Sequence, residues 1–283
     1  MTTKAKGTSV TQKLVDLQRK SGVTFTNLAT SFLIERLVAR LVAEKSLRTS
    51  LVFKGGFVGL KVYASPRYTV DLDAVLMKAN IQATLGITKV AAESDLNDGV
   101  WFVFENQIDL ATQGEYGGIR QVFRAGIGPK LKKLEKAQII NFDIGIGDPV
   151  TPGPVSAQIE SIISGEELSW SVYPIETIVA EKLHAVVSLG DANSRSKDIY
   201  DLNLFFSRTE PKILRSAIEK CFAFRNTELP KSFVKVIASI NTGVLERGWG
   251  RAVSSIPDAP KFKVCFDGLI IQLEAFEAGL RRN

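Results

Sequence analysis

The chain has 283 residues, enough for about two domains of ordinary size. Hydrophobic residues make up 45% and charged residues 23%, which excludes disordered and fibrous proteins. Two cysteines and one histidine exclude a disulfide scaffold and a multi-histidine metal site, so any bound metal should be a hard ion held by oxygen ligands. The formal net charge is +6 and the pI is about 9.2, a mild excess that suits a polyanionic partner.

The N-terminal sequence lacks the apolar core of a signal peptide, and no run of about 18 apolar residues occurs. We therefore expect a cytoplasmic protein with no membrane partner, in a reducing compartment.

The first part of the chain mixes helical and strand periodicity. Leu33, Leu37 and Leu41 recur at intervals of four, as on one face of a helix. The elements predicted here are, in order, helices at 9–21 and 25–45, a strand at 51–54, a helix at 57–63, a strand at 69–76, a helix at 80–93 and strands at 100–105, 119–124 and 138–146.

A loop rich in glycine and proline follows at 147–154, and after about residue 172 the pattern is helical only. The helices predicted there are at 174–188, 195–207, 211–224, 230–240 and 264–280. The sequence thus predicts an α+β protein with N-terminal helices at 1–45 packed on the core, a core at 46–165 and a helical C-terminal domain at 166–283.

Two glycines and two aspartates form the first candidate site. Gly55 and Gly56 follow a strand, where glycines let the backbone approach a phosphate and expose amide donors. Asp71 and Asp73 lie two residues apart on a predicted strand and therefore share one face. Such a pair can hold the Mg²⁺ of a nucleoside triphosphate. The alternative is a solvated strand face without a ligand.

Asp143 interrupts the apolar run of the strand at 138–146. A buried, unpaired charge is costly, so we interpret Asp143 as reaching the same face as Asp71 and Asp73. A third carboxylate there could accept the proton of an attacking hydroxyl. The alternative is an edge strand with one wet face, and Asp148 just beyond is easily confused with Asp143.

Lys182 lies on the predicted helix at 174–188, and Asp198 follows sixteen residues later. A lysine in this position could neutralise triphosphate charge. The alternative is an ion pair between Lys182 and Asp198 that needs no substrate. Asp201 faces the same way as Asp198, because the two are three residues apart on a helix. For His184 we expect packing or a surface position rather than catalysis.

Five blocks, in this order along about residues 50–230, resemble the AbiEii family of nucleotidyltransferase-like toxins, which includes the MenT group. The blocks are Lys54-Gly55-Gly56 with Arg67-x-Thr69-x-Asp71-x-Asp73, Phe142-Asp143-Ile144-Gly145 with Gly147-Asp148 and Thr151-Pro152, Tyr173-Pro174 with Glu176-Thr177 and Ala180-Glu181-Lys182, Asn193-Ser194-Arg195 with Lys197-Asp198 and Tyr200-Asp201-Leu202, and Phe224-Arg225-Asn226-Thr227 with Pro230.

The resemblance implies a polymerase-β-type nucleotidyltransferase core with a mixed sheet, followed by a helical domain. It implies a transfer of nucleotide from an NTP that depends on Mg²⁺ or Mn²⁺. Family toxins modify tRNA 3′ ends and are paired with a separate antitoxin, so the resemblance also implies an RNA acceptor and a cognate antitoxin.

The residue roles implied by the resemblance follow the matched positions. Asp71, Asp73 and Asp143 match the metal carboxylates, and Lys182 and Asp198 match a catalytic lysine and a late acidic residue. The remaining pocket positions are Lys54, Gly55, Gly56, Arg67 and Thr69. Because the family often has a serine after the first glycine, Thr69 is the candidate to supply the missing hydroxyl.

Two other functions stay open: nucleotide transfer onto a protein hydroxyl, and a non-catalytic relative that binds nucleotide or antitoxin. For an RNA acceptor, the candidate surfaces are the basic segments at 130–136 and 212–235. The first is favoured because it immediately precedes the strand of Asp143. For both segments a merely solvated surface is the alternative.

Overall fold

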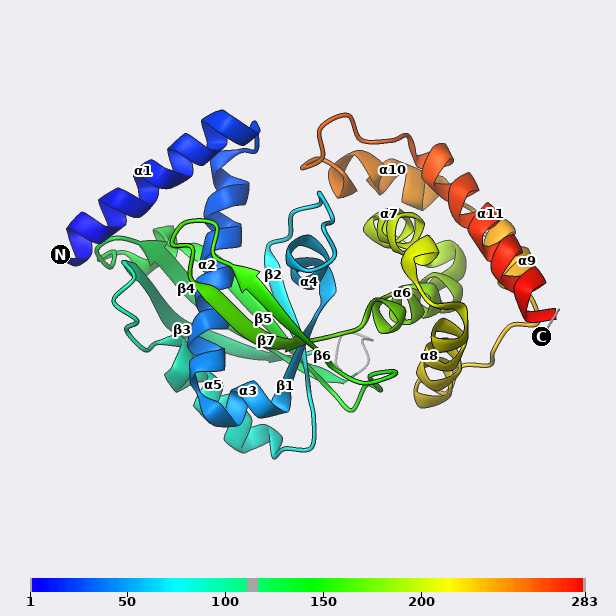
Figure 1. The fold of residues 1–283 in the computed structure, drawn as a ribbon, viewed down its shortest axis with the longest axis horizontal. Helices are drawn as coiled ribbons and strands as arrows, with labels where there is room; N and C mark the ends of the chain where they lie inside the picture. Colours follow the sequence, from blue (N-terminus) through cyan, green and yellow to red (C-terminus); the bar gives the residue numbers. More distant parts are fainter. Residues whose placement is uncertain (1, 111–116, 282–283) are drawn as a thin grey trace. The chain divides into compact units, whose positions relative to one another are not determined.

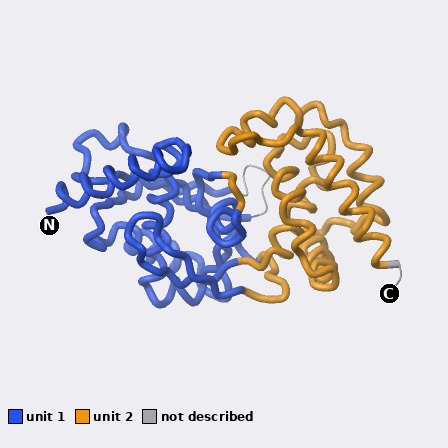
Figure 2. The backbone as a smooth tube through the Cα atoms, turned by 45° about the horizontal axis from the view of Figure 1, so that its top comes forward, with its two compact units in different colours: residues 1–64, 68–147, 155–172 blue, residues 65–67, 148–154, 173–283 orange. Residues whose placement is uncertain are grey.

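The computed structural model describes residues 2–110 and 117–281. The chain divides into two compact units (Figure 2). Unit 1 comprises residues 1–64, 68–147 and 155–172, and unit 2 comprises residues 65–67, 148–154 and 173–283. Unit 1 contains the β-sheet and unit 2 is helical (Figure 1), which confirms the predicted α+β class with a helical C-terminal part.

Unit 1 holds seven strands and five helices within the described residues. The helices are α1 (Thr3–Ser21), α2 (Phe25–Ala43), α3 (Lys45–Ser50), α4 (Gly55–Lys61) and α5 (Ile81–Ala92). The strands are β1 (Leu51–Lys54), β2 (Asp71–Leu76), β3 (Val100–Asp109), β4 (Gly118–Ile127), β5 (Gln138–Ile146), β6 (Val155–Glu160) and β7 (Glu167–Val172).

The strands form one mixed sheet in the order β3-β4-β5-β2-β1-β7-β6. β2 pairs parallel with β5 and antiparallel with β1, so strands that are far apart in sequence meet at its centre. Leu72 of β2 and Phe142 of β5 are register partners and are fully buried. α2 and α5 cover this apolar face: Gln138 of β5 donates to Thr30 of α2, and Gln121 of β4 bonds to Thr88 of α5. The opposite face carries the polar residues of β2 and β5.

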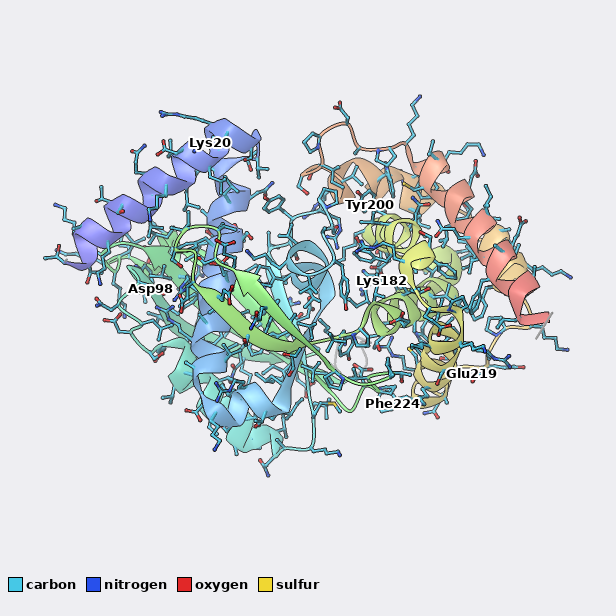
Figure 3. The ribbon with its side chains drawn as sticks, viewed as in Figure 1. Lys20, Asp98, Lys182, Tyr200, Glu219 and Phe224 are labelled. Carbon is cyan, nitrogen blue, oxygen red and sulfur yellow. The ribbon has the colours of Figure 1, made fainter. Side chains whose placement is uncertain are left out.

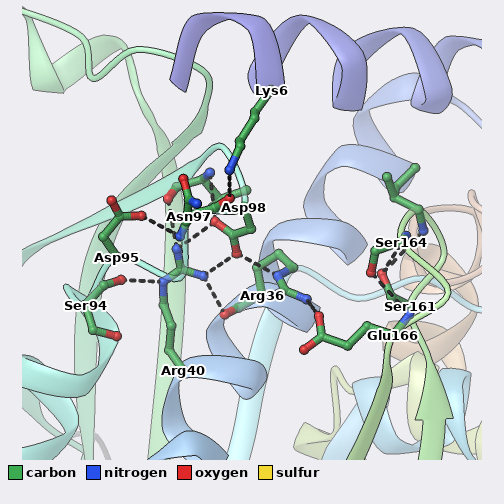
Figure 4. Close-up of polar contacts among 12 residues, drawn as sticks. Lys6, Arg36, Arg40, Ser94, Asp95, Asn97, Asp98, Ser161, Ser164 and Glu166 are labelled. Atoms are coloured by element: carbon green, nitrogen blue, oxygen red, sulfur yellow. Dashed lines mark hydrogen bonds and ion pairs between the residues drawn. The ribbon is translucent and has the colours of Figure 1, made fainter. Parts of the chain in front are cut away.

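A buried charge network fixes α2 to the start of β3 (Figure 4). Arg36 Nε and Arg40 Nη1 donate to Asp98 Oδ2 at 2.7 and 2.8 Å, and Arg40 Nη2 also donates to the carbonyl of Val100 at 2.8 Å. Burial would raise the pKa of Asp98, but the two arginines outweigh it and lower the pKa. Arg36 Nη1 also donates to Glu166 Oε2 at 2.6 Å, and the whole network serves the packing of α2.

Unit 2 is built from helices that bury one apolar face each. They are α6 (Ile175–Leu189), α7 (Ser196–Phe205), α8 (Pro211–Phe224), α9 (Phe233–Ala238), α10 (Gly243–Ala252) and α11 (Phe262–Arg281). Leu183, Phe205 and Phe222 are at most 1% exposed and form the centre of this unit. None of the described helices in either unit is long and apolar enough to cross a membrane.

The sequence did not predict four of these elements: α3, the β6–β7 hairpin and α10. β6 is a polar edge strand in which only Ile159 is buried, so its alternation gave a poor signal. The helix predicted at 9–21 begins earlier, at Thr3, where Thr2 caps it, and the helix predicted at 230–240 is confined to Phe233–Ala238.

Candidate active site

A polar row crosses the exposed face of the central strands in unit 1. Lys54 of β1 is the register partner of Asp73 in β2, Asp73 is the partner of Asp143 in β5, and Asp143 is the partner of Arg120 in β4. All four side chains are half-buried. Asp71 lies on the same face, one step further along β2, opposite Asn141. The sheet therefore brings the three predicted carboxylates onto one face.

Gly55 contacts the carboxylate of Asp73 directly. A Cβ added at Gly55 would lie 2.0 Å from Asp73 Oδ2, and its backbone φ is +73°, in the left-handed region. No other residue type fits such a position without displacing the carboxylate. The glycine motif and the acidic motif, which lie 18 residues apart in sequence, thus form one site.

Asp71 is held by a neutral donor. Asn141 Nδ2 donates to Asp71 Oδ1 at 2.9 Å, which orients the carboxylate without neutralising it. The hydroxyl of Thr69 lies 3.5 Å from the backbone nitrogen of Asp71. This contact places Thr69 at the entry to β2, beside the acidic pair.

Asp143 is clamped by a guanidinium group. Arg120 Nε and Nη2 donate to its two oxygens, each at 2.7 Å, and the Asp143 side chain is 17% exposed. This bidentate pair explains how β5 tolerates a charge in an apolar run. Each oxygen of Asp143 thus accepts one hydrogen bond from Arg120 and keeps a second lone pair.

The donor set of Asp71 and Asp73 suits one particular kind of metal. Within the part of the chain that the structure describes, no group of three or more His, Cys, Asp or Glu side chains could hold a metal ion. Mg²⁺, however, is commonly bound by one or two carboxylates together with substrate phosphates. Two aspartates on one strand face fit an ion that arrives with a nucleoside triphosphate and do not form a complete protein cage.

The other predicted site residues lie in unit 2 and form a buried ion cluster. Lys182 Nζ lies 2.7 Å from Asp198 Oδ1 and 2.8 Å from Asp201 Oδ2. Arg67 donates to both oxygens of Asp201 at 3.0 and 2.7 Å, and Arg195 Nε donates to Asp198 Oδ2 at 2.7 Å. Figure 3 labels Lys182 on α6 of this unit. The ion pair that the sequence left as an alternative for Lys182 is thus present.

The charges of this cluster stabilise one another. Burial would raise the pKa of Asp198 and of Asp201. Lys182 and Arg195 outweigh this effect at Asp198, and Lys182 and Arg67 outweigh it at Asp201, so both pKa values are lowered. Burial would lower the pKa of Lys182, but Asp198 and Asp201 outweigh it and raise the pKa. All three groups are therefore charged at neutral pH.

Asp148 and His184 belong to a second network of unit 2. Arg225 Nη2 lies 3.1 Å from Asp148 Oδ1 and 3.3 Å from Glu181 Oε1, and His184 Nε2 lies 2.8 Å from the hydroxyl of Thr227. The His184 ring also packs edge-on against Phe222. Asp148 therefore has a different environment from Asp143, and His184 packs as predicted.

Sequence reasoning missed Arg120 and Asn141, the two partners that orient Asp143 and Asp71. A signal for Arg120 did exist, because it is a charged residue inside a predicted strand. Its pairing became visible only with the antiparallel register of β4 and β5.

With this geometry established, comparison with known proteins identifies the family. The family described as "Nucleotidyl transferase AbiEii toxin, Type IV TA system" matches residues 36–277, most of the chain. The chain belongs to the AbiEii family. This confirms the resemblance seen in the motifs, and it makes the chain a nucleotidyltransferase of a toxin–antitoxin family.

A solved structure shares this fold. JHP933 from Helicobacter pylori is 15% identical, covers 92% of this chain and 95% of its own, and superposes with a TM-score of 0.53. The antibiotic-resistance factor ANT(2'')-Ia is 14% identical and covers 68% of this chain and 90% of its own, with a TM-score of 0.38. No curated protein sequence matches this chain.

Proposed function

We propose that this AbiEii-family chain transfers a nucleotide from an NTP to an RNA acceptor, the 3′ end of a tRNA being the first candidate. In this reaction the acceptor hydroxyl oxygen bonds to the α-phosphorus, the bond between the α-phosphorus and the bridging oxygen breaks, and pyrophosphate leaves. The hydroxyl proton passes to a base. The observation that best supports this proposal is the contact of Gly55 with Asp73, which brings the glycine motif and the acidic motif together.

The residues of unit 1 suit these roles. Asp71 and Asp73 would hold Mg²⁺ or Mn²⁺, and such an ion supplies charge neutralisation of the phosphates. Gly55 and Gly56 leave room for the backbone of α4 to lie near a phosphate. Lys54 lies next to Asp73 in the row and adds a positive charge, while Thr69 offers a hydroxyl at the entry to β2.

Asp143 has a more restricted role in this proposal. Because Arg120 donates to both of its oxygens, we assign Asp143 first to holding the polar row in place. Each oxygen keeps a second lone pair, so the roles of Asp143 as a metal ligand and as a base stay predictions. For Lys182, Asp198 and Arg67, the contacts support a structural role, and a role in transfer stays a prediction.

An exposed basic segment favours RNA over a protein acceptor. Lys132 and Lys133 are exposed in the loop that leads into β5, the strand of Asn141 and Asp143. At about 3.3 Å per residue, the run from Lys136 to Asp143 spans about 23 Å. Stacked nucleotides spaced about 3.4 Å apart cover that distance in about seven steps.

The test uses the purified full chain with Mg²⁺ or Mn²⁺, each α-labelled NTP in turn, and separate pools of tRNA and protein. We expect label on RNA from an α-labelled NTP and none from the same γ-labelled NTP. Label on protein alone would replace the proposed acceptor, and label from a γ-labelled NTP would contradict nucleotide transfer. The family's toxin–antitoxin description further leads us to propose a cognate antitoxin, which should suppress the labelling or its effect when co-expressed.

A further inference from the structure

The net charge of the chain is concentrated in two short segments of unit 1. Residues 2–21, which contain α1, and residues 129–138, the loop before β5, together carry nine basic and two acidic residues. The rest of the chain has 27 basic and 28 acidic residues. The excess positive charge therefore lies in these two segments and is not spread over the whole chain.

The structure brings these two segments together. A Cβ added at Gly7 of α1 would lie 2.2 Å from the Cα of Gly128, so the helix backbone rests directly on the residue where the basic loop begins. Lys6 Nζ donates to the carbonyl of Asn97 at 2.7 Å, and Gly128 N donates to the carbonyl of Gly99 at 2.7 Å. α1 is thus anchored at the origin of the loop.

The anchoring leaves the positive charges in solvent. α1 contacts α2 and β4 and buries Gly7, Val10 and Leu14, and the other described residues of this helix are exposed or half-buried. The exposed basic residues of the two segments are Lys4, Lys13, Arg19, Lys20, Lys130, Lys132, Lys133 and Lys136. Figure 3 labels Lys20 at the C-terminal end of α1. Only Lys6, which bonds to Asn97, is half-buried.

The side chains between these charges indicate the class of partner. Among the described residues, no large apolar side chain of α1 is exposed and the loop at 129–138 exposes one, Leu131, whereas a helix that lies on a membrane needs a row of such side chains. Instead, Thr8, Ser9 and Gln12 are exposed, and hydroxyl and amide groups beside lysines are typical of contacts with phosphate oxygens.

We infer that α1 and the loop at 129–138 form a basic platform that binds the phosphate backbone of the acceptor nucleic acid. The inference deepens the proposed function and rests on it in one respect, namely that the bound strand is the acceptor. Binding on this platform follows the backbone and carries no base specificity. It would hold an RNA on the unit that carries Asp71 and Asp73.

A quadruple variant of the helix tests the platform: Lys4→Gln, Lys13→Gln, Arg19→Gln and Lys20→Gln. Glutamine keeps a high helix propensity, so α1 should stay folded, which circular dichroism checks. Binding of labelled bulk tRNA is measured between about 50 and 200 mM salt, where each lost phosphate contact lowers the slope of log K against log salt by about 0.7–0.9. We expect a slope lower by about 2 or more and at least tenfold weaker binding at low salt.

The matched control removes the same charge from unit 2. The variant Lys212→Gln, Lys220→Gln, Lys231→Gln and Lys235→Gln neutralises four exposed lysines of the segment at 212–235. We expect it to keep the wild-type slope. Equal losses in both variants, or a wild-type slope in the α1 variant, overturn the platform. Wild-type binding to phosphatidylserine vesicles without binding to tRNA overturns it as well.

The platform and the proposed function fail separately. The binding experiment contains no NTP, so it measures the affinity of the platform for tRNA whatever reaction the protein catalyses. If wild-type protein labels protein and never RNA, the proposed acceptor is wrong, whereas the platform is then judged by the salt slopes alone. If RNA is labelled and the α1 variant labels it at wild-type rates at all salt concentrations tested, the platform is wrong and the proposed function stands.

Discussion

Asp71 of the sheet and the buried aspartates of the helical unit differ in how protein groups neutralise them. In unit 1, Asp71 accepts from a neutral amide, and its β2 face is half-exposed. In unit 2, Asp198 and Asp201 are at most 1% exposed, and each bonds to two cationic side chains. A carboxylate oriented by an amide keeps its charge available to a cation, whereas one closed by two cations is already satisfied. These contacts predict a ligand site at Asp71 and a role in the fold for Asp198 and Asp201, and the variants below test both predictions.

The largest expected effect is on transfer, from the acidic pair of unit 1. Asp71→Asn or Asp73→Asn removes a negative charge and little volume, so we expect activity to fall by about 10³-fold, the equivalent of several kcal/mol of transition-state stabilisation. Because both residues are half-exposed, the melting temperature should change by only a few degrees. Asp109→Asn, a strand aspartate elsewhere in the sheet, is the matched control. Wild-type labelling by either site variant would refute the assignment.

The buried cluster should show the opposite pattern. Lys182→Met leaves Asp198 and Asp201 with one cation each, and breaking a buried pair costs about 3–5 kcal/mol. We expect the melting temperature to fall by about 10 °C, with activity per folded molecule reduced far less than in the Asp71 variant. Arg195→Gln is the control, because Arg195 is 45% exposed and its pair contributes about 1 kcal/mol or less.

The same experiment decides whether Lys182 is also catalytic. A Lys182→Met protein that melts within about 2 °C of wild type yet has lost transfer would make the cluster part of the reaction. In that case the contrast between the two units would concern burial and not function.

A glycine substitution sharpens the description of the sheet site. Gly55→Ala places a methyl group against the Asp73 carboxylate at a φ of +73°, which we expect to cost about 1–3 kcal/mol of stability and most of the activity. Gly86→Ala in the middle of α5 meets no atom within 4 Å and should add about 0.5–1 kcal/mol. Chemical denaturation measures both. An active Gly55→Ala enzyme would show that the contact with Asp73 is incidental.

Arg120 tests how far Asp143 matters within the polar row. Arg120→Gln removes both bonds to Asp143 and leaves Asp71 and Asp73 intact, so we expect a loss of transfer between about 10- and 100-fold through misplacement of the row. Asp143→Asn should give a loss of similar size, and the double variant should lose little more than either single one. Fully additive losses would show that Asp143 acts independently of Arg120.

The sequence predicted the acidic face well because it depends on local geometry. Alternation in β2 places Asp71 and Asp73 together whatever the rest of the chain does. The partners of these groups depend on register: Arg120 meets Asp143 only because β4 and β5 pair antiparallel, and Arg67 meets Asp201 across 134 residues of sequence. Neither contact has a local signature. The β6–β7 hairpin was missed for a related reason, since an edge strand such as β6 needs few apolar residues.

The smallest expected effect concerns the pH dependence of unit 2, which holds the single histidine of the chain. Burial, with Arg225 close by, lowers the pKa of His184 to about 4 from 6.5, although Asp148 acts in the opposite direction. Between these values the unfolded chain binds a proton that the folded chain does not, so this contribution to stability is complete above pH 6.5 and is lost as the pH falls toward 4.

Urea unfolding of the wild type should therefore show a loss of up to about 1 kcal/mol in the free energy of unfolding between pH 7 and pH 5.5. His184→Gln keeps a group that can bond to Thr227 but does not titrate, so its stability should stay nearly constant over that range. If the variant loses as much stability as the wild type, groups other than His184, including the carboxylates of either unit, cause the acid sensitivity.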